Sequence, residues 1–284
     1  MLILNGKQVA QAHQVKLSQE VAVFAKTYGR RPGLAVILVG DDPASHVYVR
    51  NKEKACQEVG IVSFRYALPK HAAQAEVEAQ LAELAVNPMI DGILVQFPLP
   101  HGLSQDRVLE AISPQKDADG LTFANLGYLL AGKATVQPCT PHGVMQILAH
   151  YGTGLAGRHA VVVGRSHIVG KPMAQMLLNA DATVTVCHSK TQNLAQYTRQ
   201  GDVVVVAAGR PNFLGRDDFK PGAVVVDVGI HRLAGGLCGD VRFAELEGHV
   251  SAATPVPGGV GPMTIAMLLD NTLRLAERRM SGIE

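Results

Sequence analysis

The feature that most constrains the fold of this chain is a set of valine-rich runs in its second half. The runs are AVVVG at 160–164, TVTVCH at 183–188, DVVVVAAG at 202–209 and AVVVDVG at 223–229. Continuous apolar runs of this length are typical of strands that are buried on both faces of a parallel sheet. Helical patterns separate the first three runs, at about 170–180 and 191–200. The second half therefore predicts an α/β domain.

The first half shows the same alternation of short apolar runs and helical patterns. It predicts strands at 34–40, 61–68 and 91–100. It predicts helices at 45–60, with Ser45 near the start and Gly60 as the stop, and at 75–87 and 104–112. We expect a second α/β domain here.

An irregular stretch from Ser113 to Pro141 marks the connection between the two halves. Thr140 and Pro141 predict a helix start there, because a threonine oxygen caps a helix and proline tolerates the first helical position. A length of 284 residues allows two domains of ordinary size. We predict a first domain at 1–120 and a second at 121–262, with a last helix from about 263 to 284 returning to the first.

Composition argues against several classes of protein. Charged residues make up 18%, and 26 Lys and Arg face 24 Asp and Glu without a basic block, so we expect no nucleic-acid partner. The four cysteines form no CxxC pair and no HExxH motif is present, so we expect no metal. We expect no membrane partner and a cytoplasmic protein, because neither a signal peptide nor an apolar run of about 20 residues is evident.

A glycine turn follows the first valine run of the second half, in VVVGRSHIVGKP at 161–172. A strand that leads through glycines into a helix start places several backbone N–H groups where they can hold a pyrophosphate. The spacing from Gly164 to Gly170 is not GxGxxG, so the usual dinucleotide fingerprint is absent. Taken alone, the turn could be a plain connection between a strand and a helix.

The end of the next strand favours NADP over NAD. In an NAD site an Asp or Glu about 20 residues beyond the turn binds the ribose 2′-hydroxyl. Cys187, His188, Ser189 and Lys190 stand in that region and include no acid, whereas Arg165 lies in the turn. Hydrogen-bond donors and positive charge in place of an acid suit a 2′-phosphate. Without Arg165, a strand that simply ends in polar residues would be the better interpretation.

Four residues of the first half form a candidate catalytic group. Tyr48 and Lys52 have i, i+4 spacing, so a helix presents them on one face. Gln96 ends a predicted strand, where ligands of open α/β sheets bind, and Asp119 lies in the irregular connector. Singly, such residues are usually a solvated lysine and turn or capping residues. The YxxxK spacing also occurs in short-chain dehydrogenases, but there it follows the nucleotide fingerprint, whereas here it precedes it.

Eight distinctive segments follow one another along nearly the whole chain: VGDDPASHVYVRNKEKAC at 39–56, GILVQFPLP at 92–100, PQKDADG at 114–120, PCTP at 138–141, VVGRSHIVGKP at 162–172, TVCHSKT at 185–191, DVGI at 227–230 and PVPGGVGPMT at 255–264. In these segments the chain resembles the bifunctional methylenetetrahydrofolate dehydrogenase/methenyltetrahydrofolate cyclohydrolase family.

The resemblance implies two α/β domains with a cleft between them: an N-terminal catalytic domain and a C-terminal Rossmann-like NADP-binding domain, assembled as a homodimer. It implies that Lys52 is the catalytic lysine, with Tyr48 and Gln96 beside it, and that Asp119 holds the pterin of a folate substrate. Further substrate contacts are implied for Val95, Pro257, Gly258, Gly259, Val260 and Gly261. NADP contacts are implied for Gly164, Arg165, Ser166, Ser189 and Ile230.

The two implied reactions make different demands on the protein. Oxidation of 5,10-methylenetetrahydrofolate to the methenyl form transfers a hydride to NADP, for which the protein supplies orientation. Hydrolysis of the methenyl form to 10-formyltetrahydrofolate moves protons, and a lysine serves only if its pKa falls from about 10.4 toward neutrality. Burial and a cationic substrate lower a lysine pKa. Gln96 would hold Lys52 as a neutral partner, whereas a carboxylate would keep the amine charged.

Two alternatives remain at this stage. A dehydrogenase that has lost the cyclohydrolase activity is disfavoured by the presence of Tyr48, Lys52 and Gln96. A non-catalytic NADP-binding sensor predicts a disrupted first-domain site, and this one is intact in sequence. An assay that follows methenyltetrahydrofolate as it appears and decays distinguishes all three hypotheses.

Overall fold

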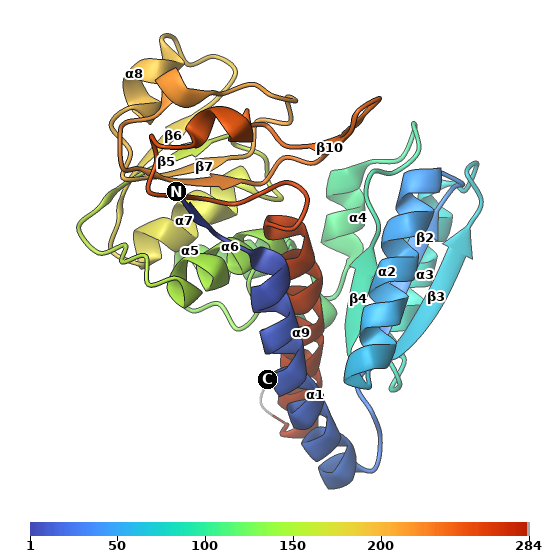
Figure 1. Ribbon diagram of the computed structural model, residues 1–284. Helices are drawn as coiled ribbons and strands as arrows, with labels where there is room; N and C mark the ends of the chain where they lie inside the picture. Colours follow the sequence, from blue (N-terminus) through green and yellow to red (C-terminus); the bar gives the residue numbers. More distant parts are fainter. Residues whose placement is uncertain (283–284) are drawn as a thin grey trace. The chain divides into compact units, whose positions relative to one another are not determined.

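The computed structural model describes residues 1–282, shown in Figure 1. The chain divides into two compact units. Met1–Ala12 with Pro138–Thr264 form one, here called the six-stranded unit; His13–Gln137 with Ile265–Glu284 form the other, the three-stranded unit. Two long helices, α1 (Gly6–Tyr28) and α9 (Val260–Met280), each contain a point where the chain passes between units. The functional roles of 1–120 and 121–262 stay a prediction.

The six-stranded unit contains the parallel sheet that the valine runs predict. Its strands follow the order β1-β11-β8-β7-β5-β6, and every neighbouring pair is parallel. The strands are β1 (Leu2–Ile3), β5 (His159–Val163), β6 (Thr183–Cys187), β7 (Val203–Val206), β8 (Val224–Asp227) and β11 (Ala252–Ala253). Every residue of β7 and β8 is buried, which confirms for these strands the prediction of burial on both faces. For β6 the prediction is wrong, because β6 is the edge strand of the sheet and its Thr183 and Val186 are exposed.

The helices of this unit are α6 (Cys139–His150), α7 (Gly170–Asn179) and α8 (Leu194–Thr198), with short 3-10 turns at Arg216–Asp218 and Phe243–Leu246. Helix α7 packs against β5 and β6. Helix α8 is shorter than the expected 191–200, because Asn193 before it has a left-handed backbone with φ of 51°. A hairpin of β9 (His231–Leu233) and β10 (Gly236–Cys238) extends from the sheet, and the sequence patterns did not predict it (Figure 1).

The three-stranded unit has a parallel sheet in the order β3-β2-β4. The strands are β2 (Gly33–Val39), β3 (Val62–Leu68) and β4 (Gly92–Val95). The central strand β2 is buried along its whole length. Strand β4 ends earlier than the expected 91–100, because Pro98 and Pro100 lack the N–H group that a ladder needs. Gln96 is therefore the first residue after the strand.

The helices of this unit are α2 (Pro43–Val59), α3 (Gln74–Val86), α4 (Gln105–Ala111) and α5 (Phe123–Leu130), together with a 3-10 turn at Pro114–Lys116 and most of α1 and α9. Asp42 caps α2 by accepting a hydrogen bond of 2.8 Å from the N–H of Ser45, and Gly60 ends it with φ of 90°. The sequence patterns did not predict α1, although Asn5 caps it by accepting from the N–H of Gln8 at 3.1 Å.

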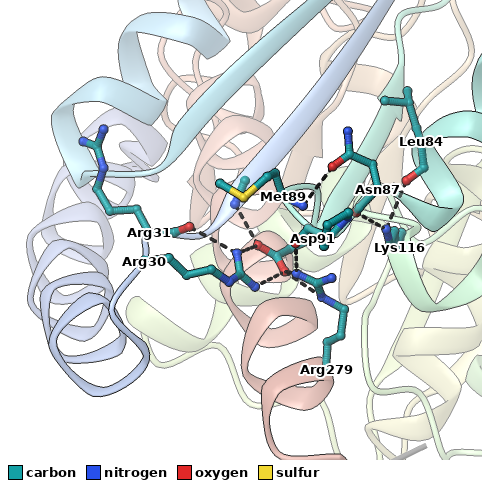
Figure 2. A network of polar contacts seen from close by, with 10 residues as sticks. Arg30, Arg31, Leu84, Asn87, Met89, Asp91, Lys116 and Arg279 are labelled. Atoms are coloured by element: carbon teal, nitrogen blue, oxygen red, sulfur yellow. Dashed lines mark hydrogen bonds and ion pairs between the residues drawn. The ribbon is translucent and has the colours of Figure 1, made fainter.

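A buried carboxylate joins the amino-terminal ends of β2 and β4 to the ends of α1 and α9 within the three-stranded unit. Asp91 is 1% exposed and accepts two hydrogen bonds from Arg30, at 2.7 and 2.8 Å, and one from the N–H of Gly33. Arg279 of α9 donates to the same carboxylate at 3.0 Å (Figure 2). Asp91 is thus paired with a cation on each side. Removal of either arginine would destabilise the fold, because the buried carboxylate would lose part of the charge that compensates it.

Lys116 lies beside this group, and its side chain caps the carboxyl end of α3. Its ammonium donates to the carbonyls of Leu84 and Asn87 at 3.0 and 2.8 Å (Figure 2). Burial, together with the nearby charge of Arg279, lowers the pKa of Lys116 to about 8. This lysine is therefore part of the fold, at the opposite end of the sheet from the carboxyl ends of the strands. Within residues 1–282, no helix has the length and apolar character needed to span a bilayer.

Candidate active site

The structure brings Lys52 and Gln96 together at the carboxyl end of β4. The Lys52 amine donates a hydrogen bond of 2.9 Å to the Gln96 side-chain oxygen. The Gln96 amide nitrogen in turn donates to the carbonyl of Phe97 at 2.6 Å, which directs its oxygen toward the lysine. Both side chains are half-buried. The lysine is thus held by a neutral acceptor that does not stabilise its positive charge as a carboxylate would.

Two further residues of α2 share the helical spacing of Lys52. Tyr48 precedes it by one turn and is 42% exposed, so its phenol is accessible to a ligand. Cys56 follows it by one turn and is fully buried. Burial raises the pKa of the Cys56 thiol to about 12, so this cysteine stays protonated and is a packing residue rather than a nucleophile.

The two acids of the KDADG segment have different surroundings, and only Asp119 is a candidate site residue. Asp117 is 1% exposed and accepts hydrogen bonds from the N–H groups of Gly120 and Thr122, at 2.9 and 2.7 Å, and from the Asn125 side chain at 2.9 Å. Asp117 therefore shapes the turn. Asp119 is half-buried in the same turn.

The same segment runs beside β4, which fixes where Asp119 lies. Ile93 and Asp117 form a parallel bridge, and the N–H of Ala118 donates to the carbonyl of Ile93 at 3.2 Å. Asp119 lies two residues beyond Asp117, just as Val95 lies two residues beyond Ile93, so Asp119 is placed beside the carboxyl end of β4. Asn271 of α9 anchors the segment by donating to the Ala118 carbonyl at 2.9 Å. This support was missed from sequence, because an asparagine inside a helix carries no recognisable signal.

In the six-stranded unit, two glycines allow the turn after β5 to pack closely. Gly164 has φ of 135°, and a Cβ there would stand 2.2 Å from the carbonyl oxygen of Ala207. A Cβ on Gly170 would stand 2.2 Å from the Gly164 oxygen. The Ser166 hydroxyl accepts from the N–H groups of Val169 and Gly170 at 3.2 and 3.3 Å, so it caps α7 and keeps its own proton for an external acceptor. This turn, here called the cofactor cradle, suits a pyrophosphate through its closely packed glycine backbone and the Ser166 hydroxyl, since the first N–H groups of α7 already donate to Ser166.

Arg165 and Ser189 lie at the same end of adjacent strands. Val163 pairs with Cys187, and the N–H of Gly164 donates to the Cys187 carbonyl at 2.8 Å, so the turns after β5 and β6 are neighbours. Both side chains are exposed. Because neither turn carries an acid, the pair fits a 2′-phosphate better than a bare ribose hydroxyl.

The remaining predicted residues of the six-stranded unit lie in the loop after β8 and in a glycine-rich loop that leads into the first turn of α9, and these two segments meet. Ile230 follows β8 and is 42% exposed; a Cβ on Gly261 would lie 3.2 Å from its Cδ1 atom. The Pro257–Gly261 loop is held to the start of α1, since the N–H of Lys7 donates to the Gly258 carbonyl at 2.9 Å. Gly259 packs so closely there that a Cβ would lie 2.5 Å from the Pro255 oxygen. Val260 begins α9.

A pair of buried acids beside the cofactor cradle was missed in the sequence. Asp227 ends β8 and accepts from the N–H groups of Gly229, Asp240 and Val241 at 2.8–3.0 Å. Burial outweighs these bonds and raises the pKa of Asp227 to about 6. The available signals were an acid at a strand end in DVG and a second acid after glycine in CGD. In the part of the chain that the structure describes, no group of three or more His, Cys, Asp or Glu residues is placed to hold a metal ion.

Comparison with known proteins agrees with the two-domain α/β fold. Residues 4–119 match the catalytic domain of the tetrahydrofolate dehydrogenase/cyclohydrolase family, and residues 138–280 match its NAD(P)-binding domain. The chain is 58% identical over 281 residues to the bifunctional protein FolD of Bdellovibrio bacteriovorus, covering 98% of each chain.

Solved structures extend this agreement. The bifunctional methylenetetrahydrofolate dehydrogenase/cyclohydrolase FolD of Campylobacter jejuni superposes with a TM-score of 0.95 at 50% identity, covering 98% of this chain and 99% of that one. The Trypanosoma brucei enzyme, solved with NADP cofactor and inhibitor, also gives 0.95, at 40% identity and 99% and 98% coverage. This chain belongs to the tetrahydrofolate dehydrogenase/cyclohydrolase family.

Proposed function

We propose that this chain is a bifunctional enzyme of one-carbon metabolism. It oxidises 5,10-methylenetetrahydrofolate to 5,10-methenyltetrahydrofolate with NADP and then hydrolyses the product to 10-formyltetrahydrofolate. The observation that carries the proposal is the 2.9 Å hydrogen bond from Lys52 to Gln96, a lysine held by a neutral amide at the carboxyl end of a strand. Family membership supports the substrate, and a lysine held in this way suits the proton transfer of the hydrolytic step.

In the first reaction, the residues of this chain bind and orient the reactants. NADP, when bound, accepts the hydride. We assign Gly164 and Ser166 to its pyrophosphate, and Arg165 and Ser189 to its 2′-phosphate, in keeping with the close-packed glycine turn and the neighbouring turns after β5 and β6. Ile230 is assigned to the cofactor as well. No protein group has to take a proton in this step.

In the second reaction, water adds to a cationic carbon and the ring then opens, so protons must leave one atom and reach another. Lys52 is assigned this proton transfer, because its amine is within hydrogen-bond reach of a fixed neutral acceptor and is half-buried. A cationic substrate beside the amine disfavours the ammonium form and so favours a lysine that can take a proton. Tyr48 is assigned to the same substrate because it lies on the same face of α2.

The pterin and its surroundings are assigned to residues that flank β4 and to one glycine-rich loop. Asp119 is half-buried in a turn that Asp117 and Asn271 hold in place, which suits a carboxylate that accepts hydrogen bonds from a pterin. Val95 is assigned to the substrate, as is the loop Pro257, Gly258, Gly259, Val260 and Gly261. Residues 1–120, with the last helix, are assigned the folate-binding catalytic role, and 121–262 the NADP-binding role.

We also propose that the enzyme is a cytoplasmic homodimer that acts on tetrahydrofolate derivatives and binds neither nucleic acid nor membrane. The even balance of charge supports the absence of a polyanion partner. Leu233 and Leu237 on the β9–β10 hairpin are 47% and 38% exposed, which supports association of the chain with a second copy. Light scattering coupled to size-exclusion chromatography tests the assembly: a mass of about twice 30.1 kDa is expected, and a monomer mass would contradict it.

A coupled assay tests the proposed activity. The purified chain is given 5,10-methylenetetrahydrofolate with NADP or with NAD at matched concentrations. We expect methenyltetrahydrofolate to appear and then to decay to the formyl product faster than in buffer alone, with a higher initial rate for NADP. Formation without accelerated decay would indicate a dehydrogenase alone, and cofactor binding without formation would indicate a sensor.

A further inference from the structure

One carboxylate in the six-stranded unit organises the turn that follows β7. Asp240 is fully buried and accepts hydrogen bonds from the N–H groups of Ala208, Gly209 and Arg210 at 2.6, 2.9 and 2.9 Å. His231 donates from Nε2 to the same carboxylate at 2.7 Å. Four donors on a single acid fix its position, because an acid buried at this depth is costly unless every lone pair is used.

The partners of Asp240 lie at the carboxyl ends of the central strands. The 208–210 turn follows β7, and His231 begins the hairpin just after β8. Ala207, the residue directly before this turn, packs against the cofactor cradle, since a Cβ on Gly164 would lie 2.2 Å from the oxygen of Ala207. Asp240 therefore joins the loop after β8 to the loop that forms one side of the glycine turn.

Two glycines show how closely this arrangement is packed. A Cβ on Gly229 would lie 2.4 Å from an Asp240 oxygen, and a Cβ on Gly239 would lie 1.9 Å from an Asp227 oxygen. Asp227 meanwhile accepts from the Asp240 backbone N–H at 3.0 Å. The backbone of residues 227–229 and 239–240 thus leaves room for these two carboxylates and for little else.

We propose that His231 and Asp240 are positioning residues for the dinucleotide. This inference rests on the proposed function. Arg165 and Ser189 assign the adenosine end to the turns after β5 and β6, so the other half of the dinucleotide has to extend over the ends of β7 and β8. The Asp240 carboxylate and the His231 imidazole hold the 208–210 turn and the Ile230 loop in a fixed relation, and these two loops form the wall of that half of the site.

Three histidine variants test the inference through NADP affinity, measured by titration calorimetry of the full chain. His231→Leu removes the donor, and we expect a roughly tenfold rise in Kd, because only about a tenth of the free variant would then keep the two loops in the arrangement that binds NADP. His231→Gln keeps an N–H donor and should stay within about threefold of the parent. His249→Leu is the matched control: His249 donates to the Phe219 carbonyl at 2.8 Å near the amino ends of the strands, and its loss should leave the Kd unchanged.

Amide hydrogen exchange of the apo protein gives a readout that does not depend on the cofactor. We expect the amides of residues 208–210 to exchange faster in His231→Leu than in His231→Gln or His249→Leu. Unchanged Kd and unchanged exchange in a folded His231→Leu would overturn the inference, as would an equal loss of affinity in His249→Leu. A parent chain that binds no NADP would overturn the proposed function and this inference together, whereas normal binding by the parent confines a failure to the inference.

Discussion

The amine of Lys52 donates a hydrogen bond of 2.9 Å to the side-chain oxygen of Gln96, and the other end of that amide donates to the carbonyl of Phe97. The second bond sets which atom of the amide faces the lysine. A neutral acceptor positions the amine without adding the attraction that would keep it protonated. The chemistry assigned to Lys52 depends on this choice of partner.

Replacing Gln96 with glutamate should therefore impair hydrolysis more than its small change in size suggests. A carboxylate beside the amine raises the pKa of Lys52, and the fraction able to take a proton at neutral pH falls about tenfold for each unit. We expect the kcat/KM profile for methenyltetrahydrofolate hydrolysis by Gln96→Glu to shift to higher pH. Gln96→Met is the control: it loses the acceptor and activity but should show no alkaline shift. A Gln96→Glu profile that lies on that of the parent would contradict the assignment.

Arg165→Ala should weaken NADP far more than NAD. Arg165 is exposed in the turn after β5, next to the acid-free turn that holds Ser189. A charge-assisted contact with a phosphate is worth about 1.5–3 kcal/mol, or roughly tenfold to a hundredfold in affinity. Titration of both cofactors into parent and variant measures the difference. Equal losses for NADP and NAD would show that Arg165 does not contact the 2′-phosphate.

Much of the fold follows from residue patterns, because its strands are short, apolar and buried. The valine runs locate β5, β6, β7 and β8 to within a few residues, and the glycine stop of α2 falls at Gly60. Helix α1 was not predicted, although the buried residues Leu17, Val21 and Phe24 have helical spacing. Exposed Val15 and Val23 on its other face obscure this stripe in the sequence, and the Asn5 cap is a weak signal by itself. The β9–β10 hairpin is three residues long on each side, too short for an alternating pattern to register.

Part of the candidate site could likewise be predicted from the sequence, and part could not. Lys52 and Gln96 were singled out by spacing and by position at a strand end, and the structure brings them together. Spacing does not reveal that Asp117 shapes the turn that carries Asp119, since both acids stand in one five-residue segment and only three-dimensional contacts separate them. Nor does it reveal Asp240, whose partners lie 9 to 32 residues away along the chain.

The two acids of KDADG should respond differently to the same substitution. Asp117→Asn loses acceptor capacity for three buried donors and should destabilise the protein by roughly 2–4 kcal/mol. Asp119→Asn should leave the melting temperature nearly unchanged and lower kcat/KM for the folate substrate by at least tenfold. Thermal unfolding and steady-state kinetics of both variants provide the comparison. A large loss of stability in Asp119→Asn with normal kinetics would reverse the assignment.

The buried Lys116 should make stability depend on pH in the alkaline range. Its folded pKa of about 8 lies below that of an unfolded lysine, so between about pH 8 and 10.5 the unfolded chain binds more protons than the folded one. The free energy of unfolding of the parent should therefore rise over this window, relative to Lys116→Met, by about 1–3 kcal/mol.

Urea titrations at several pH values measure this difference. Lys54→Met is the control, because Lys54 is exposed and its ion pair with Glu58 spans 3.8 Å. Curves for the parent and Lys116→Met that run parallel from pH 8 to 10 would show that Lys116 keeps an ordinary pKa.

The central claim is that Lys52 moves the proton in hydrolysis, and the fate of methenyltetrahydrofolate with Lys52→Met tests it most directly. Methionine keeps most of the side-chain bulk and removes the amine. We expect hydrolysis to fall by roughly 10²–10⁴-fold, the range typical of a general acid–base residue, while NADP affinity hardly changes and part of the dehydrogenase activity persists. In the coupled assay, methenyltetrahydrofolate should then accumulate instead of decaying to the formyl product. Hydrolysis by the variant at near the parental rate, above that of the buffer, would contradict the claim. Loss of both activities in a folded variant that still binds NADP would also contradict it, because Lys52 would then be a substrate-positioning residue.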